Sequence, residues 1–248
     1  MNKASLIVIA VVLGLAQVAR AGEIKVIAGG SMTASLNQLA PEFERTTGQK
    51  LVIHFDSTPN IIARVTSGTP FDAVVVPLDV FRDATAKARF APGTPIDIAR
   101  VGYGVIVRAG AARPDISTPD AFKRTLLAAP SIAFLPASAA GAYVTKVFER
   151  LGIAEDMKAK TKVQPAPAQI PQAVAKGEAE LGVFLTNVLM APGVDLVGPF
   201  PGELQQELVF GAAVAADTRE ADAARAFIDY LKTPAATSII RAAGLTPG

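Results

Sequence analysis

Four short loops, rich in glycine and hydroxyl-bearing residues, are the part of this sequence best suited to binding chemistry. Each follows an apolar, strand-like run and leads into a helix-like segment, and the loops span residues 29–32, 56–60, 136–143 and 169–171. The first N–H groups of a helix have no partner inside it, and hydroxyls donate hydrogen bonds, so such loops suit an anion. One loop alone is also typical of an ordinary helix cap. Four of them predict an anion site built from hydrogen-bond donors, without a metal or cofactor.

Few residues could do metal or acid–base chemistry. The chain has a single histidine, His54, no cysteine and no loop of clustered carboxylates, so no metal site is expected. His54 lies two residues before the second loop and would be a general base if it faced a cleft. The pattern of residues 51–55 favours packing beneath a helix instead. Asp56 and Tyr143 are the other candidates for proton transfer near the loops.

Alternating strands and helices must position these loops. Strands are expected at 24–28, 50–55, 73–76, 102–108, 131–134, 181–185, 195–197 and 207–215. Helices are expected at 33–47, 60–67, 79–88, 119–128, 141–151, 169–176, 219–231 and 235–242. This alternation, with apolar strands, predicts an α/β fold with mainly parallel sheets covered by helices. Ligands of such sheets bind where strand ends meet helix N-termini, which is where the four loops fall.

Residues 1–21 have the pattern of a cleavable signal peptide. Lys3 precedes an apolar run at 6–18, and Ala19-Arg20-Ala21 fits a cleavage site, so the mature chain is expected to begin at Gly22 and to be exported to the periplasm. Removing Lys3 and Arg20 takes the 24 Lys and Arg residues to 22, which equals the 22 Asp and Glu residues. A balanced charge argues against a nucleic-acid partner, because nucleic-acid binding needs a basic face.

Several segments, in their order and spacing, point to one protein family. They are the strand leading to 29–31, and residues 39–48, 55–58, 67–74, 140–143 and 177–182. With them the chain resembles the molybdate-binding-protein-like branch of periplasmic substrate-binding proteins, which serve ABC transporters. The resemblance implies a type II binding-protein fold with two α/β lobes, two crossovers and a ligand cleft between the lobes. Lobe 1 is expected at residues 22–99 plus 208–248 and lobe 2 at residues 100–207. A monomer that delivers a small anion to a permease is implied as well.

The resemblance also implies which residues bind the ligand. The family's first two ligand serines fall on Ser31 and Ser57, and its backbone contacts fall on Ala140 and near Ile170. The expected binding set is Gly30, Ser31, Met32, Ser57, Thr58, Ala140, Gly141 and Ile170. Two positions depart from the family pattern. The ligand tyrosine falls on Leu185, which has no hydroxyl, and Asp56 puts a carboxylate beside the expected anion. Both departures argue against molybdate itself.

Organic anions are the alternative ligands. Residues 115–119 and 193–199 look closer to a subgroup linked to carboxylates, which is similar to a periplasmic aconitate isomerase. Arg64 and Arg100 are candidate partners for a carboxylate, because the planar guanidinium matches its geometry. Two functions therefore stay open. One is capture of a small anion, either a carboxylate or an oxyanion such as molybdate. The other is isomerisation of an unsaturated acid such as aconitate. A signalling receptor would share the same site.

Overall fold

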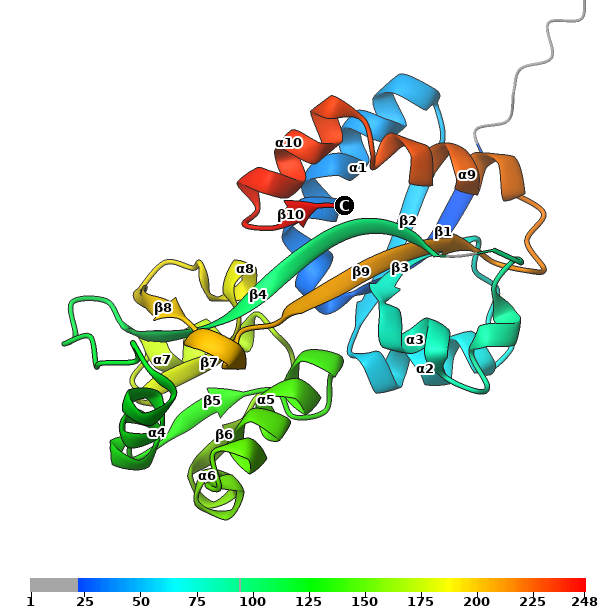
Figure 1. The fold of residues 1–248 in the computed structure, drawn as a ribbon. Coiled ribbons are helices and arrows are strands. Elements are labelled where there is room, and N and C mark those ends of the chain that lie inside the picture. The colour runs from blue at the N-terminus through cyan, green and yellow to red at the C-terminus, as the bar shows by residue number, and fades with distance from the viewer. Residues whose placement is uncertain (1–21, 94) are drawn as a thin grey trace, which may run out of the picture.

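Two long strands, β4 (Ile96–Arg108) and β9 (Glu207–Val214), run through the middle of the molecule (Figure 1). The computed structural model describes residues 22–93 and 95–248, so the signal peptide expected at 1–21 lies outside the described residues. β4 pairs antiparallel with β9 as far as Gly102, and then with β7 (Leu181–Leu185) from Tyr103 onward. The strand therefore passes from one part of the sheet to the other at Gly102 and Tyr103. The sheet order is β2-β1-β3-β9-β4-β7-β5-β6, with two further strands on β4.

The first part of the sheet is buried on both faces. β1 (Glu23–Gly29) pairs in parallel with β2 (Lys50–Asp56) and β3 (Ala73–Pro77), and β3 pairs with β9. One face packs against α1 (Thr33–Thr47), whose Leu36 and Phe43 are fully buried. The other face packs against α2 (Thr58–Thr66) and α3 (Leu78–Arg82). The chain ends with α9 (Ala221–Tyr230), α10 (Pro234–Ala242) and the short β10 (Thr246–Pro247), which pairs with β4.

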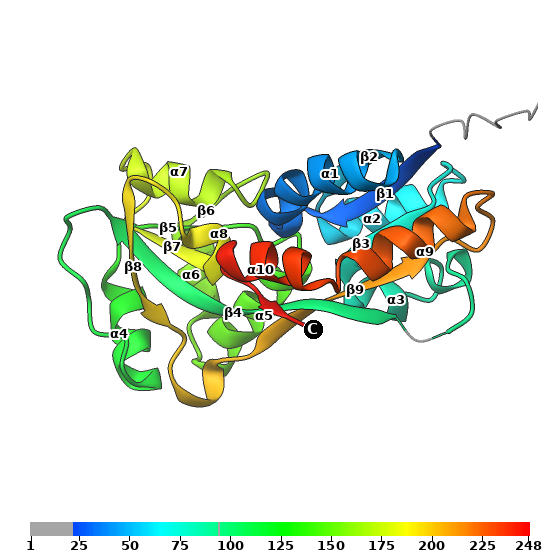
Figure 2. The same cartoon turned by 90° about the horizontal axis from the view of Figure 1, so that it is seen from above.

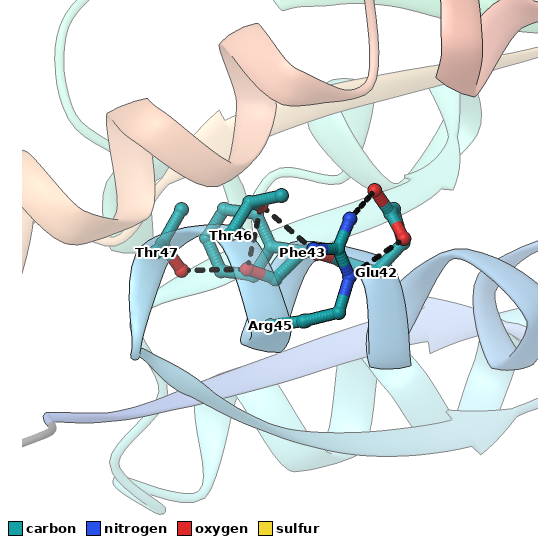
Figure 3. A network of polar contacts seen from close by, with 5 residues as sticks. All are labelled: Glu42, Phe43, Arg45, Thr46 and Thr47. Carbon is teal, nitrogen blue, oxygen red and sulfur yellow. Dashed lines mark hydrogen bonds and ion pairs between the residues drawn. The ribbon is translucent and has the colours of Figure 1, made fainter.

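Local hydrogen bonds fix the C-terminal end of α1 (Figure 3). The hydroxyls of Thr46 and Thr47 donate to the carbonyl of Phe43, and Arg45 pairs with Glu42 on the surface. Gly48, with a φ of 71°, then ends the helix in the left-handed region that glycine favours. The opposite end of α1, which follows the short 3-10 turn Gly30–Met32, is the end that lies near the first loop.

The second part of the sheet contains β5 (Ile132–Phe134), β6 (Thr161–Val163), β7 and β8 (Val194–Pro199). β5 is parallel to β6 and β7, whereas β4 is antiparallel to β7 and β8. The helices around this second part of the sheet are α4 (Pro119–Ala128), α5 (Ala139–Arg150), α6 (Ala154–Lys160), α7 (Gln169–Ala175) and α8 (Thr186–Leu189). Seen from above, β4 runs from one part of the molecule into the other (Figure 2).

The sheet is mixed, which corrects the expectation of mainly parallel sheets. Five of its nine strand pairs within the described residues are antiparallel, and all five involve β4 or β9. β4 also begins six residues earlier than expected, and α6, β6 and α8 were not expected. The helix expected at 79–88 ends at Arg82, because the carboxylate of Asp83 accepts the N–H groups of Thr85 and Ala86. The lobe boundaries near residues 100 and 207 stay a prediction.

Among residues 22–93 and 95–248, no helix has the length and apolar character needed to cross a membrane.

Candidate functional site

A small pocket lies where the 3-10 turn before α1 and the N-termini of α2 and α5 meet. Its volume is about 20 Å³, which is enough for little more than one water molecule. The walls come from the ends of β1 and β2, the start of α5, the loop before α7, and β7 and β9. The lining residues are Gly29, Gly30, Ser31, Asp56, Ser57, Thr58, Pro77, Leu135, Ser138, Ala139, Ala140, Pro167, Phe184, Leu208 and Phe210. Three of the four loops singled out in the sequence therefore meet here, and the fourth contributes only the preceding Pro167.

Hydrogen-bond donors in this pocket are left without partners. The hydroxyls of Ser31 and Ser57 make no hydrogen bond within the part of the chain that the structure describes, although Ser57 is the N-cap residue of α2. The N–H groups of Thr58 and Ala140, in the first turns of α2 and α5, likewise have no partner among the described residues. Helix N-termini carry partial positive charge, so these donors favour an anion.

The first turn of α5 is held in place by its own cap. The Ser138 hydroxyl accepts the N–H of Gly141 at 2.9 Å and donates to the carbonyl of Leu135 at 2.9 Å. A Cβ on Gly141 would lie 1.8 Å from that carbonyl oxygen, so only glycine fits. Gly141 is therefore required by the close approach of two backbone segments, and it does not line the pocket.

Contacts between the two parts of the molecule close this pocket. The N–H of Ala139 donates to the hydroxyl of Thr58 at 3.0 Å. On the other side, the amide of Asn187 donates to the carbonyl of Ser31 at 2.8 Å. Pro167 lies so close to Gly30 that a Cβ there would be 3.3 Å from the proline Cγ. The structure is thus a closed arrangement in which a ligand would be surrounded.

Asp56 is engaged by its neighbours. One carboxylate oxygen accepts the Ser57 N–H at 2.8 Å and the Asn60 amide at 2.7 Å, and the other lies 3.3 Å from Nε2 of His54. Burial alone would raise the pKa of Asp56, but these hydrogen bonds outweigh it and the pKa is lowered. The carboxylate therefore stays ionised, and it accepts hydrogen bonds from the Ser57 N–H and the Asn60 side chain at the start of α2. His54 is less buried than expected, with its side chain 40% exposed on the edge strand β2, and it lines neither this pocket nor the groove described below.

The structure brings together five of the eight residues expected to bind the ligand. Gly30, Ser31, Ser57, Thr58 and Ala140 line the pocket. Met32 and Ile170 are fully buried in the apolar core and do not line the pocket, and Pro167 lines it near the place expected for Ile170. Leu185 is also fully buried, whereas the preceding Phe184 lines the pocket. The sequence analysis missed Ser138, although the serine three residues before Gly141 has the spacing of a helix cap. The binding roles of all these residues stay a prediction.

A larger groove of about 620 Å³ adjoins the pocket. Both are lined by Thr58, Ser138, Ala139 and Leu208, so the two spaces share a wall. The groove runs between α2 and α3 on one side and α5 on the other, and both Tyr103 and Tyr143 line it. Its charged lining residues are Asp79, Arg82, Lys146 and Glu207. Arg64 and Arg100, the arginines expected to meet a carboxylate, line neither space, and Arg100 pairs with Asp97.

The described residues contain no cluster of three or more His, Asp or Glu side chains suited to a metal ion. Hydrogen-bond donors and the charged residues of the groove are thus the chemistry that the site offers.

The sequence of this chain matches the model of a protein family. The model of a family described as bacterial extracellular solute-binding protein matches residues 24–246. The chain belongs to this family. The family membership confirms the resemblance identified in the sequence.

Two curated relatives cover almost the whole of this solute-binding protein. The chain is 33% identical to aconitate isomerase from a Pseudomonas species over 229 residues, which cover 90% of this chain and 87% of that protein. It is 29% identical to the molybdate-binding protein ModA of Azotobacter vinelandii over 241 residues, or 93% of this chain and 92% of that protein.

A solved structure shows the same fold. The periplasmic molybdate-binding protein of Azotobacter vinelandii superposes with a TM-score of 0.74 at 23% sequence identity, covering 90% of this chain and 98% of that one. The solute-binding protein therefore has the type II periplasmic binding-protein fold predicted from the sequence.

Proposed function

We propose that this protein captures a small anion in the closed pocket and delivers it to the permease of an ABC transporter. One observation carries the proposal. The Ser31 and Ser57 hydroxyls and the N–H groups of Thr58 and Ala140 surround one space and have no partners among the described residues. Ser31, Ser57 and Thr58 are half-buried, and a ligand with acceptor oxygens would give these donors partners. The names of the two relatives, a molybdate-binding protein and an aconitate isomerase, support an anionic ligand.

Ligand entry requires the pocket to open. We propose that residues 22–99 plus 208–248 form one lobe, that residues 100–207 form the other, and that the strands near Gly102 and Tyr103 act as the hinge. The contacts Ala139–Thr58 and Asn187–Ser31 would break on opening and form again around the ligand. We also propose that the protein acts as a monomer in the periplasm, where the permease would recognise the closed form.

Calorimetric titration of the mature chain, from Gly22 onward, tests this site. The ligands would be molybdate, sulfate, phosphate, citrate and both aconitate isomers. Ser31→Ala and Ser57→Ala should each weaken the bound anion about ten- to a hundredfold, because a hydrogen bond to a charged group contributes about 1.5–3 kcal/mol. Ser238→Ala is the matched control, since Ser238 is exposed on α10. Unchanged affinity in both pocket variants would refute the site.

A second function is favoured by the relative with 33% identity, the aconitate isomerase. Interconverting the double-bond isomers of an acid removes one proton from carbon and returns one to carbon, so it needs a group that accepts and donates protons. His54 lines neither space and the Asp56 carboxylate is already engaged. Asp79, Glu207 and Tyr103 line the groove and are better placed, whereas the Tyr143 hydroxyl is engaged by the Leu204 carbonyl.

Incubation of the purified protein with cis- or trans-aconitate tests the isomerase, with the two isomers followed by proton NMR. Interconversion that depends on enzyme concentration would establish it. The absence of turnover from pH 5 to pH 9 would exclude this function and leave the anion-binding function standing.

A further inference from the structure

The groove beside the pocket is too large to be explained by a single oxyanion. The pocket holds about 20 Å³ and the groove about 620 Å³, and they share the wall formed by Thr58, Ser138, Ala139 and Leu208. Spaces that bind organic molecules in proteins are typically several hundred Å³. A ligand with one anionic group in the pocket and the rest of its atoms in the groove would use both spaces. The residues that line the groove then indicate which chemical groups the rest of the ligand has.

Tyr103 is the most informative residue of the groove. Only 2% of its surface is exposed, and its ring lies 4.7 Å from that of Tyr143 and 5.6 Å from that of Phe200 between centroids. Its backbone is fixed as well. The Tyr103 N–H donates to the Gln205 side chain at 3.0 Å, and the Gln205 amide donates to the Tyr103 carbonyl at 3.0 Å. The residue is therefore held rigidly with its side chain at the wall of the groove.

The hydroxyl of Tyr103 makes no hydrogen bond with any described residue, whereas that of Tyr143 donates to the Leu204 carbonyl at 2.9 Å. The Tyr103 hydroxyl oxygen is not among the fully buried polar atoms of the described residues, so it is accessible from the groove that Tyr103 lines. Burial, followed by the nearby Tyr143 and Asp79, raises the pKa of Tyr103. The hydroxyl therefore remains protonated and can donate a hydrogen bond to a ligand oxygen.

Two cations line the groove from different helices. Arg82 is on α3 and Lys146 is on α5, both are exposed, and neither forms an ion pair among the described residues. Asp79 and Glu207 line the same groove, so the four side chains have a formal net charge of zero. The groove does not attract anions by net charge. A carboxylate there would depend on specific hydrogen bonds from the guanidinium and ammonium groups.

We propose that the ligand is an organic polycarboxylate that places one carboxylate in the pocket of Ser31 and Ser57 and a second in the groove, bound by Tyr103, Arg82 and Lys146. This inference rests on the proposed anion-binding function and narrows the ligand to one chemical class. A tetrahedral oxyanion bound by Ser31 and Ser57 would leave the Tyr103 hydroxyl and both cations without a partner.

Calorimetry with trans-aconitate, cis-aconitate and citrate as probes tests the inference, with molybdate and sulfate for comparison. The wild-type protein should bind at least one tricarboxylate more tightly than either oxyanion. Tyr103→Phe should weaken the tricarboxylate about tenfold, and the double variant Arg82→Gln with Lys146→Gln by at least as much. Tyr230→Phe and Lys158→Gln are the matched controls, because Tyr230 packs against Phe43 and Lys158 is exposed on α6, both outside the groove.

The outcomes separate this inference from the function on which it rests. If Ser31→Ala weakens the tricarboxylate but Tyr103→Phe and the double variant do not, the groove assignment is overturned and the pocket assignment stands. Wild-type binding of molybdate or sulfate with no binding of the tricarboxylates overturns it too. If Ser31→Ala and Ser57→Ala change no affinity, the pocket itself is wrong. Thermal unfolding without ligand shows whether Tyr103→Phe is folded, and the exposed Arg82 and Lys146 give an independent test.

Discussion

Tyr103 and Leu185 lie directly opposite each other in the antiparallel pairing of β4 and β7. The side chains of such a pair lie on the same face of the sheet. The family pattern places a ligand tyrosine at Leu185, and this chain has leucine there. A tyrosine is present instead on the neighbouring strand, where it lines the groove rather than the small pocket. The position of this hydroxyl fits a ligand that extends beyond the pocket.

Restoring a tyrosine at the family position should destabilise the protein. Leu185 is 0% exposed and packed in the core, so Leu185→Tyr must force larger atoms and a hydroxyl into filled space. We expect a loss of about 1–3 kcal/mol in the free energy of unfolding, measured by urea denaturation. Leu185→Met conserves volume and should cost about 1 kcal/mol or less. Equal stability of the tyrosine variant and the wild type would show that this site opens toward the pocket.

Gly141→Ala should be among the most damaging single substitutions in α5. The new Cβ would lie 1.8 Å from the Leu135 carbonyl oxygen and 2.7 Å from the Pro136 Cα, and neither backbone atom can move without disrupting the Ser138 cap. We expect a loss of about 3 kcal/mol or more in unfolding free energy. Gly198→Ala is the control, since its Cβ would meet only Ile116 at 3.5 Å. Similar stability in the two variants would contradict this packing.

Local sequence signals predicted the core of the fold well. The bounds of α1 and α4 agree with the expectation, because a left-handed Gly48 ends the first and Thr118 and Pro119 begin the second. The expectation that β4 and β9 lie in a mainly parallel sheet was wrong. A strand made of apolar residues is expected to be buried on both faces, but its composition does not indicate the direction in which it pairs. Ser31 and Ser57 were found through the resemblance, whereas Tyr103 was not. Its role depends on which residues lie across two strands, and one sequence does not reveal that pairing.

Gly30→Ala should impair closure more than folding. A Cβ at this position would be 3.3 and 3.4 Å from the ring of Pro167, across the junction between the two parts of the molecule. The proline must move outward, so the closed form should be disfavoured and ligand affinity should fall several-fold. Small-angle X-ray scattering with saturating ligand should then show a more open molecule than the wild type. Gly198→Ala serves as the control again, and an unchanged affinity in Gly30→Ala would mean that Pro167 adjusts freely.

Asp56 should make the stability of the protein depend on pH in the acid range. Its ionised carboxylate accepts hydrogen bonds from the Ser57 N–H and the Asn60 side chain, and its pKa is held below the ordinary value of 3.8. A carboxyl group whose pKa is lower in the folded chain stabilises the fold above the unfolded pKa, and that contribution is lost as the pH falls through the folded pKa. Asp56→Asn should therefore lower the free energy of unfolding by about 1 kcal/mol at pH 7.

The test compares the free energy of unfolding of the wild type with that of Asp56→Asn at each pH, because many other carboxyl groups titrate in the same range. Urea denaturation at intervals from pH 7 down to pH 2 should show the difference constant near neutrality and shrinking below about pH 4, as the wild-type carboxylate becomes protonated. Asp229→Asn is the control, since Asp229 is an exposed aspartate on α9 whose side chain makes no hydrogen bond among the described residues. A difference that stays constant down to pH 2 would show that the charge of Asp56 contributes nothing to the stability of the fold.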